Sequence, residues 1–261
     1  MHARDNEVNC PPSGLIIALG YYAGDEAAAM RLARLLADIE PRRRSDVTLA
    51  LCRRFDVEFS PLAWQTQLHC GHKFGTMALR SEREAVGHPD GCNGLWAGVM
   101  DKLAESWATG RLNAHSVLFI EADGCPLRRD WLDLLLREHE RTLAAGKRVT
   151  GHLMEVTDYP HINGTMAMHL SLWRDRPSLR VTPEKQAWDM FHAAALTGEA
   201  RPTGLIRNFY GSRDWTPQAI AAVARETAWL ASVKDDSAIA WAERELFGRR
   251  LAPPGDIPVE E

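Results

Sequence analysis

Two short apolar runs separated by one amphipathic segment constrain the fold of this chain more than any other feature. The runs are Leu15 to Leu19 and Val47 to Cys52, and residues 25–40 between them place leucine and isoleucine at helical spacing. A strand, a helix and a second strand in this order form a βαβ unit, which implies parallel strands joined by a right-handed crossover. The sequence therefore predicts an α/β fold with a mostly parallel central sheet flanked by helices.

The alternation continues toward the middle of the chain. Residues 95–107 carry apolar side chains on one side of a predicted helix, and the apolar strand Val117 to Ile120 follows. Asp130 is placed to cap a helix over 131–145, which ends near Gly146. The remaining expected elements are extended segments at 148–156 and 165–170, a helix from Thr182 and Pro183 to near Gly198, and a helix starting at Thr216 and Pro217.

Length and composition indicate one domain. A chain of 261 residues with 45% hydrophobic content can bury a sizeable core, and no linker divides it. We expect a disordered-like leader over residues 1–13, a single Rossmann-type domain over 14–248 and a polar tail over 249–261. Because 35 acidic residues oppose 31 basic ones, no overall positive field favours nucleic acid or an anionic membrane.

The cysteines and the N-terminal residues favour a cytoplasmic location. The five cysteines are scattered without paired spacing, as expected of reduced thiols: Cys10, Cys52, Cys70, Cys92 and Cys125. The first residues, MHARDNEVNCPPSG, lack the pattern of a signal peptide, and no window approaches 18 apolar residues. We therefore expect a cytoplasmic protein that does not bind membranes, and the sequence leaves its oligomeric state open.

One apolar strand ends abruptly at two acids. In SVLFIEADGCPL, residues 116–127, the strand runs into Glu121 and Asp123, and Gly124 and Pro126 favour a turn. Alternation along an extended segment points both carboxylates the same way, about 6.5 to 7 Å apart. Ligands of open parallel sheets bind beyond the carboxyl ends of strands, and carboxylates there suit Mg²⁺ or Mn²⁺ with a diphosphate. A solvated acidic turn is the alternative.

Four stretches resemble the GT-A type glycosyltransferases, which hold a nucleotide-diphosphate sugar at a DXD-like motif. Glu121-Ala122-Asp123 is similar to an ExD variant of that motif, followed by Cys125-Pro126 and Trp131-Leu132. The other stretches are LIIALGYYAGDEAAAMRLARLL near the N-terminus, GHPDGCNGLW at residues 87–96 and YPHINGTMAMHL at residues 159–170. Spread over residues 14–247, the resemblance implies a GT-A-like domain with nucleotide-sugar chemistry.

The resemblance also implies positions for the donor. Gly20, Tyr21 and Tyr22 would lie near its base and ribose, Asn93 would contact the nucleotide, and Asn163 with Gly164 would lie against a sugar. Simpler explanations stay open for these residues. Asn93 can cap a helix, Asn-Gly commonly forms a hairpin turn, and a βα turn needs nothing special from tyrosines.

A candidate base lies further along the chain. In inverting members of the resembled family an Asp or Glu in this region deprotonates the acceptor, which implies that role for Asp189, with Glu184 as second choice. Both can equally be exposed helical carboxylates.

One feature departs from the family's pattern. Many members supply a metal-binding His near the C-terminus, whereas no His follows His192 here. By resemblance to a stretch that closes the site in some relatives, Lys234 would meet phosphate and Asp235 or Asp236 would complete the cation shell. Asp236 as a helix cap is the alternative.

The sequence therefore predicts a glycosyltransferase dependent on Mn²⁺ or Mg²⁺. It would move a sugar from a nucleotide-diphosphate donor to a hydroxyl of a small molecule or a glycan. A first alternative keeps this chemistry but places the sugar on a modified base in DNA, guided by the arginine pairs 53/54 and 128/129. A second is a degenerate GT-A-fold protein that binds a partner without catalysis. The donor and the stereochemical outcome stay open.

Overall fold

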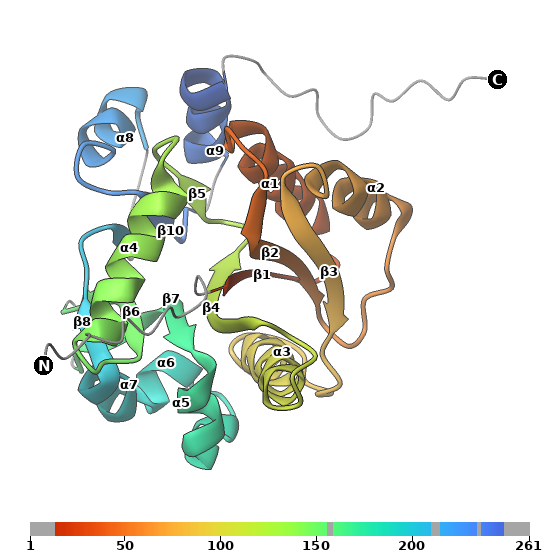
Figure 1. Ribbon diagram of the computed structural model, residues 1–261, viewed down its shortest axis with the longest axis vertical. Coiled ribbons are helices and arrows are strands. Elements are labelled where there is room, and N and C mark those ends of the chain that lie inside the picture. The colour runs from red at the N-terminus through yellow and green to blue at the C-terminus, as the bar shows by residue number, and fades with distance from the viewer. Residues whose placement is uncertain (1–13, 156–158, 210–214, 234–235, 248–261) are drawn as a thin grey trace, which may run out of the picture.

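The computed structural model describes residues 14–155, 159–209, 215–233 and 236–247, which form two sheets surrounded by helices (Figure 1). The strands are β1 (Gly14–Tyr21), β2 (Arg44–Arg53), β3 (Phe74–Arg80), β4 (Ala114–Glu121), β5 (Cys125–Pro126), β6 (Val149–Met154), β7 (His161–His169), β8 (Ala200–Pro202), β9 (Ile206–Asn208) and β10 (Trp229–Ala231). The helices are α1 (Glu26–Ile39), α2 (Pro61–Cys70), α3 (Asp90–Ala108), α4 (Trp131–Ala144), α5 (Leu170–Asp175), α6 (Trp188–Phe191), α7 (Ala193–Glu199), α8 (Pro217–Val223) and α9 (Ser237–Ala242).

The larger sheet is mostly parallel, as expected. Its strand order is β3-β2-β1-β4-β7-β6-β8, and a smaller sheet has the order β5-β10-β9. The βαβ unit is confirmed, because β1 pairs in parallel with β2 on one side and with β4 on the other. Only β7 runs against its neighbours, β4 and β6. The register places Gly20 beside both Cys52 and Glu121, so three strands end together at one edge.

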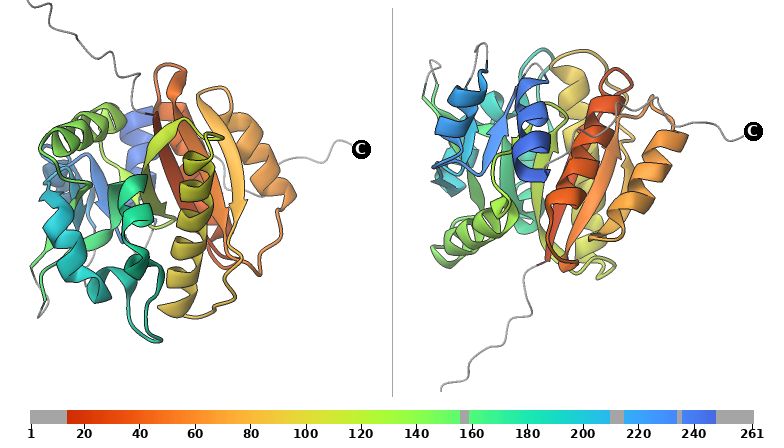
Figure 2. Two further views of the ribbon diagram at one scale, coloured as in Figure 1. Left: turned by 60° about the horizontal axis from the view of Figure 1, so that its bottom comes forward. Right: turned by 90° about the horizontal axis from the view of Figure 1, so that it is seen from above.

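Alternate residues of β1 enter two different cores. Leu15, Ile17 and Leu19 pack with apolar residues of α1, α2 and α4, whereas Ile16 and Ala18 pack with those of α3 and α5. Figures 1 and 2 show α1 and α3 on opposite faces of the sheet. Helices cover both faces, which explains why the strand is apolar at consecutive positions.

Sequence signals set several boundaries. The Thr216 hydroxyl accepts a hydrogen bond from the Ala219 amide, and Pro217 is the first residue of α8, as expected. Gly146 follows α4 with a φ of 72°, a left-handed conformation that glycine adopts without strain.

The expectation that Asp130 caps α4 is wrong, because its carboxylate pairs with Arg128 and makes no capping hydrogen bond.

Three further expectations about local structure are wrong. The helix expected from Thr182 begins only at Trp188, because Lys185 has a left-handed φ of 60° that interrupts helical hydrogen bonding. Asn93 does not cap a helix, since α3 already begins at Asp90. Asn163 and Gly164 form no hairpin turn, because both lie within β7, where cross-strand pairing holds them extended.

The predicted leader, residues 1–13, and the predicted tail, residues 249–261, lie outside the described residues. None of the helices within the described ranges combines the length and the apolar composition that crossing a membrane requires.

Candidate functional site

A cleft of about 1160 Å³ opens where β1 and β4 end. Its walls include residues of α1, α3, β7, α6 and the segment that follows β10. Ten of the predicted site residues line it: Gly20, Tyr21, Tyr22, Asn93, Glu121, Asp123, Asn163, Gly164, Asp189 and Asp236. The fold therefore brings together positions that are far apart in the sequence.

The two acids after β4 both reach this cleft. Glu121 is the last residue of the strand and is exposed, and the Gly124 amide donates to its carbonyl at 3.0 Å. Asp123 lies in that turn rather than in extended strand, so strand alternation is not what orients it. The turn requires Gly124, because a Cβ there would lie 2.6 Å from the Trp229 ring. The Asp123 carbonyl accepts from the Val233 amide at 2.8 Å, which fixes the turn against the chain after β10.

The two tyrosines after Gly20 face opposite environments. Tyr21 is 1% exposed and packs in the core with Leu19, and burial raises the pKa of its phenol to about 12. The side chain is therefore mostly buried, and because Tyr21 also lines the cleft, its expected place near a base stays a prediction. Tyr22 is 46% exposed and lies with its ring 5.4 Å from the Arg54 guanidinium carbon. Such a flat cationic and aromatic pair can stack on a planar ligand.

Asp25 is a residue of the cleft that sequence reasoning missed. Its carboxylate accepts from the Tyr22 amide at 2.7 Å. Burial raises the pKa of Asp25 to about 6, and the negative charge of Asp123 acts in the same direction. Asp25 and Asp123 are therefore close enough to interact electrostatically, and a cation bound near both would be stabilised. The sequence could have pointed to Asp25, because it is an acid in the turn GYYAGDEA that follows the first strand.

Asp189 lies against the strand that carries Asn163 and Gly164. The Gly164 amide donates to its Oδ2 at 3.0 Å, and the Met190 amide donates to its Oδ1 at 3.0 Å. His161, which sequence reasoning also missed, places Nε2 at 3.9 Å from the same Oδ2. The structure thus joins two predicted residues, Gly164 and Asp189, by a direct hydrogen bond.

Asn93 holds the segment that leads into Asp189. Its Nδ2 donates to the Gln186 carbonyl at 2.7 Å, and its Oδ1 accepts from the Trp188 amide at 3.0 Å. One turn earlier in α3, Asp90 accepts from the Lys185 amide at 2.8 Å. The first turn of α3 therefore clamps residues 185–188.

Replacing Asn93 by alanine is expected to speed tryptic cleavage after Lys185, which is exposed. Two partly exposed hydrogen bonds worth about 1 kcal/mol in total would be lost, which raises local opening roughly fivefold. Cleavage is followed by mass spectrometry, with the site after exposed Arg111 as the internal control. Equal acceleration at both sites, or none at Lys185, would contradict the clamp.

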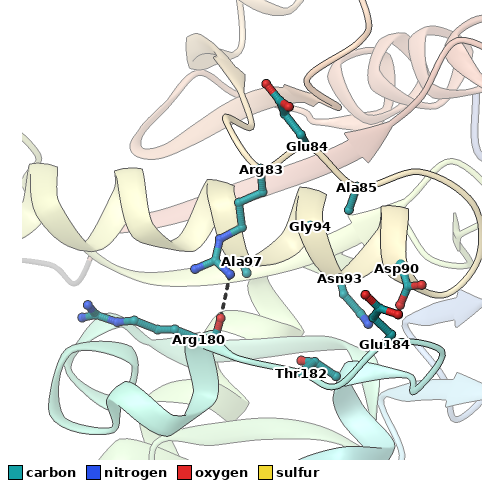
Figure 3. A pocket seen from close by; sticks show the side chains of 10 residues that line it. All are labelled: Arg83, Glu84, Ala85, Asp90, Asn93, Gly94, Ala97, Arg180, Thr182 and Glu184. Carbon is teal, nitrogen blue, oxygen red and sulfur yellow. Dashed lines mark hydrogen bonds between the residues drawn. The ribbon is translucent and has the colours of Figure 1, made fainter.

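Glu184 does not join Asp189. It lines a separate cavity of about 200 Å³ between the loop at Arg83, the first half of α3 and the segment 180–184 (Figure 3). Asn93 lies between the two spaces and lines both. Across the small cavity Arg83 donates to the Arg180 carbonyl at 2.6 Å. The structure therefore separates the two candidate bases.

The predicted C-terminal ligands are only partly described. Lys234 and Asp235 lie outside the described residues. Asp236 lines the cleft, but its Oδ2 pairs with Arg31 at 3.1 Å, and its side chain does not cap α9. Within the described ranges no three His, Cys, Asp or Glu side chains are grouped to hold a metal. Asp236 therefore does not complete such a group with Glu121 and Asp123.

Three of the arginines expected to guide a DNA strand are engaged within the protein. Arg54 pairs with Asp56 at 2.6 Å, and Arg128 pairs with Asp130 at 2.9 Å. Arg53 donates to the Val57 carbonyl. These contacts occupy cationic groups that phosphates would need.

Comparisons with known proteins identify the fold. No protein-family model matches the sequence, and neither does any curated protein. Among solved structures, the galactosyltransferase LgtC in complex with donor and acceptor sugar analogues has a TM-score of 0.56 at 13% identity, over 89% of this chain and 95% of that one. The apo structure of the bifunctional glycosyltransferase WbbM has a TM-score of 0.57 at 7% identity, over 85% of this chain and 46% of that one. Apo GlyE from Streptococcus pneumoniae TIGR4 has a TM-score of 0.54 at 10% identity, over 86% of this chain and 56% of that one. The chain has the GT-A glycosyltransferase fold, as the sequence motifs predicted.

Proposed function

We propose that this protein is a divalent-metal-dependent glycosyltransferase that moves a sugar from a nucleoside-diphosphate donor to a hydroxyl acceptor. The observation that carries the proposal is the cleft at the ends of β1 and β4, where Tyr22, Asp123 and Asp189 line one space. Its position beyond the carboxyl ends of parallel strands is where α/β sheets bind ligands. The glycosyltransferase fold supports the reaction class.

The residues of the cleft fit a hard divalent cation. Glu121 and Asp123 supply carboxylate oxygens, and Mg²⁺ commonly takes one or two carboxylates with substrate phosphates and water. This donor set needs no third protein ligand, which agrees with the absence of a three-residue group from the described ranges. When bound, the ion would neutralise the developing charge of the departing diphosphate.

The protein groups divide the cleft between donor and acceptor. Tyr22 and Arg54 present a flat surface for the base beside β1. Next to them, position 20 requires glycine, because a Cβ there would lie 2.8 Å from the Phe119 ring. On the other side, Gly164 leaves an open strip of backbone, where a Cβ would approach nothing closer than Asp189 at 3.7 Å. A sugar placed between these sides would meet the acceptor near Asp189.

Thermal-shift measurements with UDP, GDP, CDP and dTDP sugars test this proposal. One of these donors is expected to raise the melting temperature in the presence of Mn²⁺, since a ligand at 100 times its Kd stabilises by about 2.7 kcal/mol. Glu121→Ala and Asp123→Ala should each abolish the metal-dependent part of the shift without unfolding the protein. The matched control is Asp130→Ala, an exposed acid of the same segment that pairs with Arg128 outside the cleft. If no donor shifts the wild type, the proposed function is wrong.

A further inference from the structure

Arg31 is an arginine in a cleft that is rich in acids. The described residues that line the cleft include five acids and two arginines, Arg31 and Arg54. A diphosphate that enters this cleft needs cationic groups besides a metal ion, because the carboxylates repel it. Arg54 lies beside Tyr22 and is held by Asp56 at 2.6 and 2.7 Å. This leaves Arg31 as the described arginine to consider for the phosphates.

The position of Arg31 in the fold brings it toward the turn that carries Asp123. Asp25, Ala28 and Arg31 all line the cleft, and their spacing of three residues places them along one side of α1. This side begins at Asp25, which lies within electrostatic reach of Asp123. Figures 1 and 2 show α9 beside α1, and α9 also packs against β5, which begins two residues after Asp123. Arg31 therefore lies on the same side of the cleft as Asp123.

The two carboxylates that hold Arg31 differ in burial. Glu243 begins the segment η2 (Glu243–Phe247) and is 2% exposed, and its two oxygens accept from Nε and Nη2 of Arg31 at 2.7 Å each. The Asp236 side chain is 82% exposed, and its Oδ2 accepts from Nη1 at 3.1 Å. A buried pair with two bonds is costly to break, whereas an exposed single contact contributes little. Glu243 therefore fixes the guanidinium, and Asp236 is the partner that a ligand can replace.

A phosphate oxygen suits the position that the Asp236 carboxylate takes. The planar guanidinium binds phosphate and carboxylate oxygens in the same geometry, through charge-assisted hydrogen bonds. The contacts to Glu243 and Asp236 use three of its five N–H donors. When a phosphate displaces Asp236, Nη1 donates to the ligand while Glu243 keeps the guanidinium plane in place. The exchange moves an exposed side chain and leaves the buried contact intact.

We propose that Arg31 binds the diphosphate of the nucleotide-sugar donor, that Glu243 positions it, and that Asp236 competes with the diphosphate for the same guanidinium. The inference rests on the proposed function. It predicts that removing the Asp236 charge strengthens donor binding, which a purely structural ion pair would not do. Simple repulsion between Asp236 and phosphate would act whether or not Arg31 is present, so the two explanations differ in an Arg31 variant.

Isothermal titration calorimetry of UDP, GDP, CDP and dTDP with Mn²⁺ tests the assignment, and the parent nucleoside of the tightest ligand is the second probe. Arg31→Gln is expected to weaken diphosphate binding about 10- to 100-fold, because a charged hydrogen bond to phosphate is lost, and to leave nucleoside binding unchanged. Asp236→Asn should tighten diphosphate binding up to about fivefold, and Arg31→Gln/Asp236→Asn should show no such gain over Arg31→Gln. The matched control is Arg34→Gln, which changes an arginine of the same helix that donates to Thr66 and is not among the described residues lining the cleft.

A second variant separates the loss of a phosphate contact from a loss of folding. Arg31→Gln leaves the buried Glu243 without its cation, whereas Arg31→Gln/Glu243→Gln removes both charges and should bind the diphosphate as weakly as the single variant. Asp236→Asn changes an exposed side chain, so its result does not depend on the buried pair. Wild-type affinity in Arg31→Gln/Glu243→Gln, no gain in Asp236→Asn, or the same gain with and without Arg31 would overturn the assignment while leaving the proposed function intact. A wild type that binds none of the four diphosphates would overturn both.

Discussion

Replacing Arg44 by methionine is expected to lower the free energy of unfolding by about 3 kcal/mol, the low end for breaking a buried ion pair, because Arg44 and Glu40 are buried whereas Asp46 and Asp133 are partly exposed. The Arg44 side chain is 3% exposed. It makes two hydrogen bonds to Asp46, at 2.9 and 3.0 Å, and one to Asp133 at 2.8 Å. The Glu40 carboxylate, also 3% exposed, lies 3.7 Å away. Methionine conserves much of the volume but leaves these carboxylates without their cation.

The neighbouring arginine provides a matched control for this prediction. Arg42 is 68% exposed and reaches the same Asp133 at 3.6 Å, so Arg42→Met should cost less than about 1 kcal/mol. Urea unfolding followed by circular dichroism measures both variants. The Arg44 variant should also recover stability on acidification, since burial raises the pKa of Glu40 and Arg44 opposes that rise. Equal small losses in the two variants would show that the cluster contributes little.

Arg44 also illustrates why the sequence predicts elements better than contacts. The run Arg42 to Arg44 follows a helix, and cations near a helix C-terminus have an ordinary explanation in the helix dipole. What makes Arg44 different is Asp133, which lies 89 positions away and meets it only because α4 packs over the same end of the sheet. Local periodicity carries no information about such pairs. It does predict β1, α1, β2, α3, β4 and α4, where apolar spacing is strong, but it gave no expectation of α2 and β3.

In the candidate site, too, the positions of the elements could be predicted better than the contacts between side chains. Strand ends were enough to predict that Glu121 lies at the edge of the sheet where ligands bind, and the register sets it beside Gly20. Tyr21 was predictable too, because alternation places it on the face of Ile17 and Leu19, which is the core face. The contacts of Asn93 were not predictable, because they depend on backbone groups of a segment that is distant in sequence, at Gln186 and Trp188.

Acidification from pH 7 to 4.5 is expected to lower the free energy of unfolding by about 2.5 kcal/mol through one core histidine, His139. Burial lowers the pKa of His139 to about 3, whereas an unfolded histidine titrates near 6.5. Between these values the unfolded chain binds a proton that the native ring does not. The contribution of His139 to the free energy of unfolding is therefore fully present above about pH 6.5 and is lost as the pH falls toward 3.

The hydrogen bonds of His139 explain why its neutral form fits. Its Nδ1 lies 2.9 Å from the Thr150 hydroxyl, and its Nε2 lies 2.9 Å from the Ser116 hydroxyl. Thr150 donates onward to Thr142, and Thr142 donates to the Glu138 carbonyl. Thr150 must therefore accept from Nδ1–H, which leaves Nε2 to accept from Ser116. A second ring proton would turn that acceptor into a donor and place a charge in the core.

Urea unfolding between pH 7 and 4.5 measures the slope of stability against pH, at about 1.4 kcal/mol per pH unit for each proton taken up. His139→Gln should be less stable than the wild type at pH 7, because the hydrogen bonds between the ring and the hydroxyls are lost. Its stability should change less steeply with pH, by about the 1.4 kcal/mol per pH unit that one proton contributes. Asp25 acts in the opposite direction, since its raised pKa of about 6 lets the native state take up a proton first, and this contribution is common to both proteins. An unchanged slope in His139→Gln would mean that the buried ring accepts its proton as readily as the unfolded chain does.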